Sequence, residues 1–431
     1  MDFFDRDRPR REFLKRVVAM GGASALSACL ARTESGPVPT GDPNAKPARQ
    51  HAWRDYIRRD DAGNSLLPAH QVLLYLNVDG EGPPTDDQRE AVATALGTID
   101  RAYEWSHEGL LYSIAYSPAY FGRFEASLPA AVDLPAPQSL SEFETPTFDT
   151  QDAVVHLASD RADTVLAAEE ALTGEKERVN GVDVEARLTD AFTVDSRRTG
   201  FVGAGLPAQN QDVAGIPDSK PVPEDSPLFM GFTAGFVGNQ ATEDYVTLED
   251  GPFAGGTTKA ISNIRQRLDD WYLEQDHDDR VAEMFSPVHA EQGLVDGVGA
   301  NLGDNSGIDE IPDDIVDQAR EYARVGHAQK AARANRDVDG NVRLLRRHFE
   351  STDDIGSDQE VASLHFPSLQ QGISAFEDVR RSMNGVDITA ETPAVRQRVN
   401  NGILEYVFTR RRGNFLVPPR RHRVLPSPRP A

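Results

Sequence analysis

One stretch near the C-terminus gathers side chains that can do chemistry. Residues 325–349 read VGHAQKAARANRDVDGNVRLLRRHF, which places His327 ahead of the pair Arg346 and Arg347. A neutral imidazole can bind a metal ion, and a fixed guanidinium can stabilise negative charge that develops during a reaction. This stretch is locally basic, although the chain has a formal net charge of -24 at pH 7.

Several other kinds of site are excluded by their missing motifs. The sequence has no Walker loop, no HExxH and no GxSxG. The Gly-rich stretch GPFAGGTT at 251–258 lacks the Lys of a phosphate loop, so we expect a tight turn that leads into a strand. No two of the ten His are four residues apart with a Cys or Glu partner, which argues against zinc. A haem iron needs only one axial His.

The overall charge limits the partners of the chain. Acidic residues outnumber basic ones by 69 to 45. Such a surface repels nucleic acid and anionic lipid headgroups, so we expect neither as a partner. It also destabilises the compact state unless salt screens the repulsion. The chain is either an ordinary acidic protein or one from a high-salt, halophilic setting, and its few Lys and many Asp favour the second.

The N-terminus predicts export. Arg10 and Arg11 precede Phe13-Leu14-Lys15, which resembles the twin-arginine signal, and the apolar run 17–28 is too short to span a membrane. Cys29, the only cysteine, ends a stretch that resembles a lipobox; the alternative is a small buried cysteine. We predict a lipid anchor at Cys29 and a location at the outer face of the cell membrane or outside the cell. Because this export route carries folded proteins, it also hints at a cofactor.

The pattern along the first half predicts a β-α-β-β-α-β order, the ferredoxin-like unit. Apolar runs predict strands at 70–78, 109–116, 152–158 and 191–201. Helical spacing predicts helices over 85–103 and 161–172.

The second half repeats this order less clearly. We expect a strand at 257–268, a helix at 269–285, a strand at 362–367 and a helix at 372–383. The fold class is therefore α+β, with two ferredoxin-like halves in one chain that form a barrel of the dimeric α+β type. The expected divisions are a signal peptide (1–28), a flexible tether (29–59), an N-terminal half (60–204), a connection (205–256), a C-terminal half (257–415) and a disordered basic tail (416–431).

Five segments in order resemble the dye-decolorising (Dyp-type) haem peroxidase family. They are DAVVHLASD at 152–160, MGFTAGF at 230–236, GGTTKAISNIRQRLDDWY at 255–272, VGHAQK with LLRRHF at 325–349, and the closing pair at 362–383 and 403–419. The resemblance covers roughly residues 66–419 and is looser in the first half. It implies two ferredoxin-like halves and a haem b cofactor.

The same resemblance assigns roles to two residues of the basic stretch. His327 matches the axial haem ligand, whose second ring nitrogen would donate to a carboxylate or a carbonyl; Glu377 and Asp378 are the candidate carboxylates. The alternative for His327 is a surface or helix-capping histidine. Arg346 matches the distal arginine that stabilises charge as a peroxide O–O bond breaks. Adjacent strand residues point to opposite faces, so only one of the two arginines should face the pocket. The resemblance implies that it is Arg346, which leaves Arg347 as the candidate for a salt bridge.

One position departs from the family pattern. The family has an acid-base Asp in its GFxDG segment, where this chain has Ala234. Glu243 and Asp244 are candidate replacements.

The sequence thus predicts an exported haem protein that reduces hydrogen peroxide and oxidises an organic reductant, with a homo-oligomer as one option. The alternatives are a haem- or iron-handling lipoprotein without peroxidase activity, which Ala234 motivates, and a non-haem binding protein on the same scaffold.

Overall fold

The computed structural model describes residues 36–307, 315–353 and 360–430. The predicted signal peptide, Cys29 and the first part of the predicted tether lie outside the described residues. No helix in the described part is long and apolar enough to cross a membrane.

The first half forms the predicted ferredoxin-like unit. Its strands are hydrogen-bonded in the order β9-β3-β6-β4, so that the first and third strands along the chain lie at the centre. The elements are β3 (His70–Val78), α2 (Asp86–Ala102), β4 (Leu111–Tyr116), β6 (Ala153–Ser159), α4 (Ala162–Thr173) and β9 (Phe192–Phe201). All six predicted elements of this half are confirmed to within about two residues at each end.

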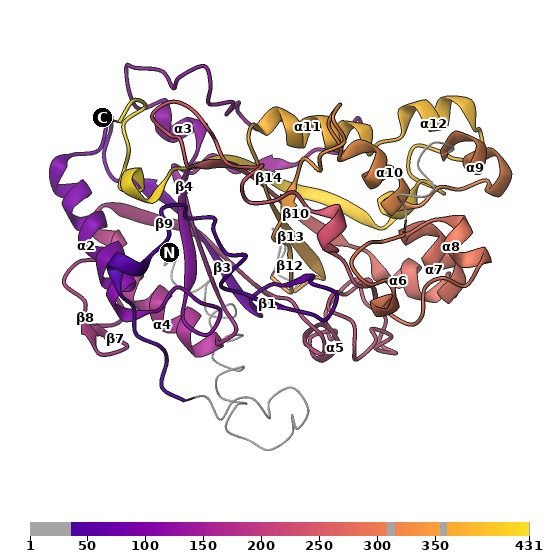
Figure 1. Cartoon of the computed structure of the whole chain (residues 1–431), viewed down its shortest axis with the longest axis horizontal. Coiled ribbons are helices and arrows are strands. Elements are labelled where there is room, and N and C mark those ends of the chain that lie inside the picture. The colour runs from indigo at the N-terminus through magenta and orange to yellow at the C-terminus, as the bar shows by residue number, and fades with distance from the viewer. Residues whose placement is uncertain (1–35, 308–314, 354–359, 431) are drawn as a thin grey trace.

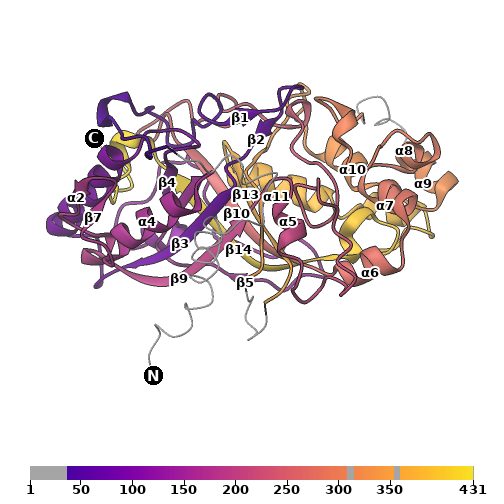
Figure 2. The ribbon, with the colours of Figure 1, turned by 90° about the horizontal axis from the view of Figure 1, so that it is seen from below.

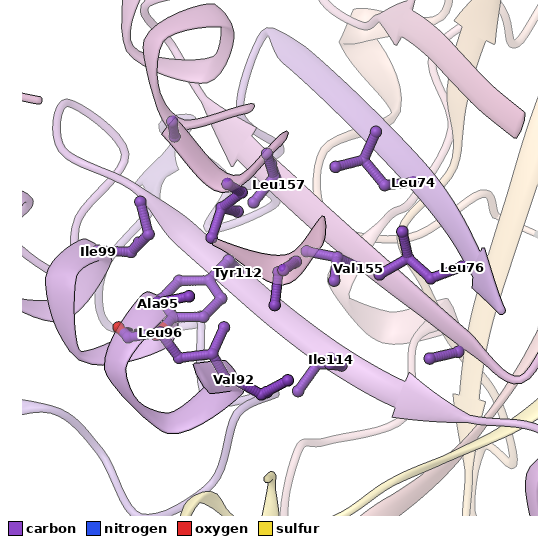
Figure 3. Packing of buried hydrophobic residues seen from close by; sticks show 14 of the residues in the cluster. Leu74, Leu76, Val92, Ala95, Leu96, Ile99, Tyr112, Ile114, Val155 and Leu157 are labelled. Carbon is purple, nitrogen blue, oxygen red and sulfur yellow. Dashed lines mark hydrogen bonds between the residues drawn. The ribbon is translucent and has the colours of Figure 1, made fainter. Parts of the chain in front are cut away.

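Local sequence signals explain why these elements begin and pack where they do. Thr85 caps α2 by accepting from the backbone N–H of Gln88, whose side chain returns a bond to the backbone of Thr85. Val92, Leu96 and Ile99 share one helix face and pack on the sheet, as Figure 3 shows. Every residue of β6 is buried. Both faces of this strand are therefore covered, so it lacks an exposed polar face even though it contains His156 and Ser159.

The second half repeats the same strand order. Its strands follow β14-β10-β13-β12, and β11 pairs with β13 beside β12. The elements are β10 (Thr257–Gln266), α6 (Leu268–Leu273), α7 (His277–Met284), α8 (Pro287–Glu291), α9 (Ile315–Tyr322), α10 (His327–Ala334), β11 (Leu345–Arg346), β12 (Phe349–Ser351), β13 (Ser363–Gln370), α11 (Ile373–Ser382), α12 (Val386–Glu391) and β14 (Val407–Val417). The helix predicted over 269–285 is wrong as a single element, because Asp276 accepts from the N–H of Asp279 and starts a new helix.

The two halves close on each other as a barrel. β9 meets β12 through the pair Phe201 and Glu350, and β4 meets β14 through the pair Tyr116 and Leu416. Since β14 also pairs with β10, the main strands form a continuous ring. In both views α2 and α4 lie at one end of the molecule and α7 to α10 at the other (Figures 1 and 2). The predicted fold class is confirmed.

Short elements complete the described part. The helices are α3 (Pro118–Phe121) and α5 (Leu206–Gln209), and the strands are β1 (Arg58–Arg59), β2 (Ser65–Leu66), β5 (Thr147–Phe148), β7 (Arg178–Val179) and β8 (Val182–Asp183). The 3-10 turns are Pro43–Ala45, Leu188–Asp190, Val237–Asn239, Ala300–Leu302, Gly402–Glu405 and Arg420–His422.

The terminal segments differ from their prediction as a flexible tether and a disordered tail. Leu425 is fully buried, and Arg423 forms an ion pair with Asp100 at 2.5 Å. Gln50 is buried and its side-chain amide donates to the carbonyls of Ile114 and Pro418. Both segments therefore pack on the first half over the described residues, because their cations and amides find partners that lie far away in the sequence.

Candidate functional site

A cavity of about 1480 Å³ brings several of the candidate residues together. Its walls come from the β1–β2 hairpin, from two loops within 202–243 and from residues 345–348. Ala234, Gln240, Arg346 and His348 all line it. The structure thus places the predicted distal arginine and the Ala position on one cavity.

The alternation of an extended chain separates three consecutive side chains around this cavity. Arg346 and His348 are two residues apart and so project to the same side of the chain, while the side chain of Arg347 projects to the other, although Arg347 also contributes to the cavity wall. The Nη2 atom of Arg347 lies 2.7 Å from Oε1 of Glu243 and donates to the carbonyl of His51. Its guanidinium also lies 4.0 Å from the centroid of the Trp53 ring. Arg347 is thus held by a buried ion pair.

Arg346 has no such partner among the described residues. Its backbone N–H donates to Oε1 of Gln240 at 2.9 Å, but its Nε atom is buried without a hydrogen-bond partner. Burial alone lowers the pKa of its guanidinium to about 10, so no described carboxylate is close enough to raise it. By contrast, the fully buried arginines of the described part each pair with a carboxylate: Arg197, Arg198, Arg347, Arg412 and Arg423.

His348 is a site residue that the sequence analysis missed. It is 6% exposed, lines the cavity and stacks on Phe366, with ring centroids 6.4 Å apart and planes at 18°. Its Nδ1 atom is buried without a partner. Burial, and then the nearby charge of Arg346, lowers the pKa of His348 to about 3, so the imidazole is neutral at pH 7. The sequence could have indicated His348, because it comes two residues after Arg346 and such residues of an extended chain project to the same side.

The loop that carries Ala234 lies against this histidine. Gly235 has a φ of +86°, and a Cβ atom added to it would lie 3.8 Å from Cε1 of His348 and 3.4 Å from Nε2 of Gln240. The loop therefore approaches the other lining residues closely, and its Ala234 brings no carboxylate to the cavity.

The two candidate replacements for the missing acid are engaged elsewhere. Glu243 lines the cavity, but it is ion-paired with Arg347 and also accepts from the backbone N–H of Trp53. The side chain of Asp244 is 84% exposed and pairs with Arg49. Neither carboxylate is free to move a proton beside Arg346.

His327 is the first residue of α10 and is not among the residues that line this cavity. Two glycines let other chain segments approach it closely. A Cβ atom on Gly402 would lie 2.9 Å from the backbone N of His327, and one on Gly326 would lie 1.8 Å from the carbonyl oxygen of Phe285. The position of this imidazole is therefore fixed by tight packing at the start of the helix.

The surroundings of His327 keep its ring neutral. Burial, followed by the charges of Lys330, Arg346 and Arg380, lowers the pKa of His327 to about 3. Its Nδ1 atom is buried without a partner among the described residues.

The two carboxylates considered as acceptors for this ring nitrogen have other partners. Glu377 accepts from Gln138 and Arg381, and Asp378 pairs with Arg343. Neither therefore holds the ring of His327.

An apolar cluster lies between α10 and the strands that carry Arg346 and His348. Ala331 and Ala334 share a helix face with His327, at spacings of four and seven residues, and pack in this cluster. Phe366 packs in the same cluster and stacks on His348. The charge of Arg346 also acts on both histidines. His327 thus faces the sheet on the side where Arg346 and His348 lie.

These residues fit a haem group in part. A neutral imidazole with an unpartnered nitrogen can serve as an axial ligand, and an unpaired guanidinium can hold an anionic group. The described residues contain no cluster of three or more His, Cys, Asp or Glu side chains that could hold a metal ion by themselves.

Solved structures with a similar fold are dye-decolorising proteins. DyPB from Rhodococcus jostii RHA1 superposes with a TM-score of 0.51 at 15% identity, covering 85% of this chain and 98% of that one. A dye-decolorizing protein from V. cholerae has a TM-score of 0.50 at 14% identity, with 85% and 96% covered. A dye-decolorizing peroxidase from Bacteroides thetaiotaomicron has a TM-score of 0.50 at 12% identity, with 85% and 97% covered. At these identities the likeness shows the fold alone.

Sequence comparison places the chain in one family. No curated protein matches it. One family model covers residues 68–419, which takes in both halves of the barrel, the cavity, His327 and Arg346. The chain therefore belongs to the Family of unknown function (DUF7405).

Proposed function

We propose that this protein binds haem b through His327 and reduces hydrogen peroxide at the face where Arg346 lies, with oxidation of an organic reductant. The observation that carries the proposal is Arg346 itself, which is charged, lines the cavity and has no carboxylate partner among the described residues. An unpaired cation in a cavity is costly to keep, so its retention points to a ligand that brings negative charge.

The roles of the chain's own residues follow from their surroundings. The ring of His327 is neutral and can offer a lone pair to iron without first losing a proton. The guanidinium of Arg346 can donate to a bound peroxide oxygen and stabilise the charge that develops on it. When bound, the haem supplies the redox chemistry that these side chains lack. Variants of the Rhodococcus protein have been solved in complex with heme; for this chain the cofactor is proposed on its own residues.

An absorption spectrum tests the haem site. The protein is produced with haem available and examined in high salt, beside His327→Ala and the matched control His277→Ala. His277 also begins a short helix and is partly buried, so it controls for the loss of a histidine at such a position. A Soret band in the wild type and in His277→Ala, but not in His327→Ala, is the expected result. A wild-type protein without a band, or a band that survives in His327→Ala, contradicts the assignment.

A second candidate is a haem- or iron-handling protein without peroxidase activity. Ala234 favours it, because the loop beside His348 carries no acid. Peroxide-dependent oxidation of a dye by the haem-loaded protein separates the two, since only the first candidate predicts turnover. A protein that folds and never binds haem would instead be a binding protein on the same scaffold.

Export and anchoring belong to the same proposal. The twin-arginine-like segment and Cys29 would place the protein at the outer face of the cell membrane, already folded around its cofactor. Mass spectrometry of the mature N-terminus, beside Cys29→Ser, tests this: a lipid-modified Cys29 is expected, and an intact N-terminus contradicts it.

A further inference from the structure

We propose that His348 is the proton-transfer group of the cavity and takes the role that Ala234 cannot fill. This inference rests on the proposed function, because it concerns a ligand bound between His327 and Arg346. It assigns a task to a histidine that the motif comparison did not include.

The position of His348 supports this role. It lines the same cavity as Arg346 and projects to the same side of the chain. The loop with Ala234 is in close approach to its ring, since a Cβ atom on Gly235 would lie 3.8 Å from Cε1 of His348. The imidazole thus stands beside the position from which a carboxylate at 234 would act.

The hydrogen bonding of the ring leaves it available. No described residue donates to or accepts from the imidazole of His348, and Nδ1 is buried without a partner. Its stacking on Phe366 fixes the plane of the ring. Other buried histidines of the described part also have a ring nitrogen without a partner; His348 differs from them in lining the cavity directly beside Arg346, and this combination points to a ligand.

The charge state of the ring suits proton acceptance. Arg346 is the only described charged group that acts on its pKa, and it acts with burial to keep the imidazole neutral at pH 7. The carboxylate of Glu243, which lines the same cavity, is held by Arg347 instead. Burial and the cation leave the lone pair of the ring free but make it a weak base; the anion that forms on a ligand beside Arg346 would offset this charge, so that the ring can take the proton and give it back.

The proposed role of the imidazole is proton transfer alone. For hydrogen peroxide, the ring would accept the proton from one oxygen and return it to the other, which leaves as water when the O–O bond breaks; a bound haem, and then the organic reductant, would supply the two electrons for this cleavage. For hydrogen cyanide, the ring takes the proton while the cyanide anion binds. Arg346 stabilises the anion in both cases.

The rate at which the haem-loaded protein binds cyanide at pH 7 measures this proton transfer without catalytic turnover. Hydrogen cyanide is protonated at that pH, so a base is needed. His348→Gln is expected to slow association by about 10²-fold, the usual contribution of a positioned base. His156→Gln is the matched control: His156 is also buried and also has an unpartnered Nδ1, but it does not line the cavity, so its removal should leave the rate unchanged.

A second substitution distinguishes proton transfer from packing. Ala234→Asp in the His348→Gln background supplies a carboxylate beside the lost imidazole, so it should raise the cyanide association rate of that variant at least tenfold. Ala234→Asn in that background has nearly the same shape without the base and should not. A merely structural role for His348 predicts that neither variant restores the rate.

A measurement on the haem-free protein does not depend on any variant. Histidine-labelled NMR should show the ring of His348 among those that stay neutral from pH 8 down to pH 5, together with that of His327, whose pKa burial also lowers to about 3. A His348 that is protonated at pH 7 overturns the inference, as does a His348→Gln protein with an unchanged cyanide rate and a normal Soret band. A wild-type protein with no Soret band overturns the inference and the proposed function together.

Discussion

Replacement by glutamine should lower the free energy of unfolding at Arg347 but not at the adjacent Arg346. Arg347→Gln removes one partner of a buried ion pair, whose side chains are only 5% and 15% exposed, and leaves the carboxylate of Glu243 without its cation. Breaking a buried pair in this way costs about 3–5 kcal/mol of folding free energy. The lost hydrogen bond to the His51 carbonyl and the lost stacking on Trp53 act in the same direction. We expect a loss of about 4 kcal/mol.

Arg346→Gln should cost little or even stabilise the fold. No described carboxylate is orphaned by this change, and the cost of keeping an unpaired cation in a buried position disappears. The backbone bond from residue 346 to Gln240 survives, because it does not involve the side chain. We expect a free energy of unfolding within about 1 kcal/mol of the wild type, or above it.

Urea unfolding in high salt, followed by tryptophan fluorescence, measures both variants. High salt screens the net charge of -24, so that self-repulsion does not obscure the difference. The linear dependence on urea gives the free energy in water. Equal losses for the two variants, or a loss below about 1 kcal/mol for Arg347→Gln, would refute the reasoning that separates a structural from a functional arginine.

Three further predictions concern burial, pH and close packing. Burial raises the pKa of Glu350 from 4.5 to about 8, so between these values the folded carboxyl keeps its proton while the unfolded one loses it. The free energy of unfolding therefore falls as pH rises through this window. In urea unfolding, Glu350→Gln should be more stable than the wild type at pH 8 and equal to it at pH 4. Leu425→Ala should cost about 2–5 kcal/mol because this leucine is fully buried, whereas Val338→Ala, at a fully exposed position, should cost almost nothing. Gly402→Ala should displace the histidine that begins α10 and weaken haem retention, while Gly340→Ala, which has a similar φ but open space, should affect stability alone.

Elements with strong local signals were predictable from the sequence. α2 is capped by Thr85 and has a clear helical apolar period, and β3 is a short, nearly continuous buried run, so local chemistry indicates where both elements lie. The repeated β-α-β-β-α-β order then indicated two equivalent halves. The closure of the barrel rests on single residue pairs between strands far apart in the chain, which no local pattern encodes.

The failures also have physical causes. A basic, Pro-rich tail is typical of disorder, yet Arg423 finds Asp100 more than three hundred residues away. His348 was overlooked because β11 and β12 are only two and three residues long, too short for an alternating pattern to be recognised. The separation of Arg346 from Arg347 follows from the alternation of an extended chain. The residues that contact them, in contrast, come from a distant loop: Glu243 pairs with Arg347, and Gln240 accepts from the backbone of Arg346.

The unpaired state of Arg346 carries the strongest argument about what this cavity is for. The chain has 69 acidic residues against 45 basic ones, so a carboxylate could easily have evolved beside any buried cation. The other buried arginines of the described part have one, and Arg346 does not. If Arg346→Gln proves to be as stable as the wild type or more so, then the cation persists for a reason other than folding. A site that gives up stability to keep a positive charge beside a neutral imidazole, with no described carboxylate paired to that charge, is arranged to receive an anion or to create one.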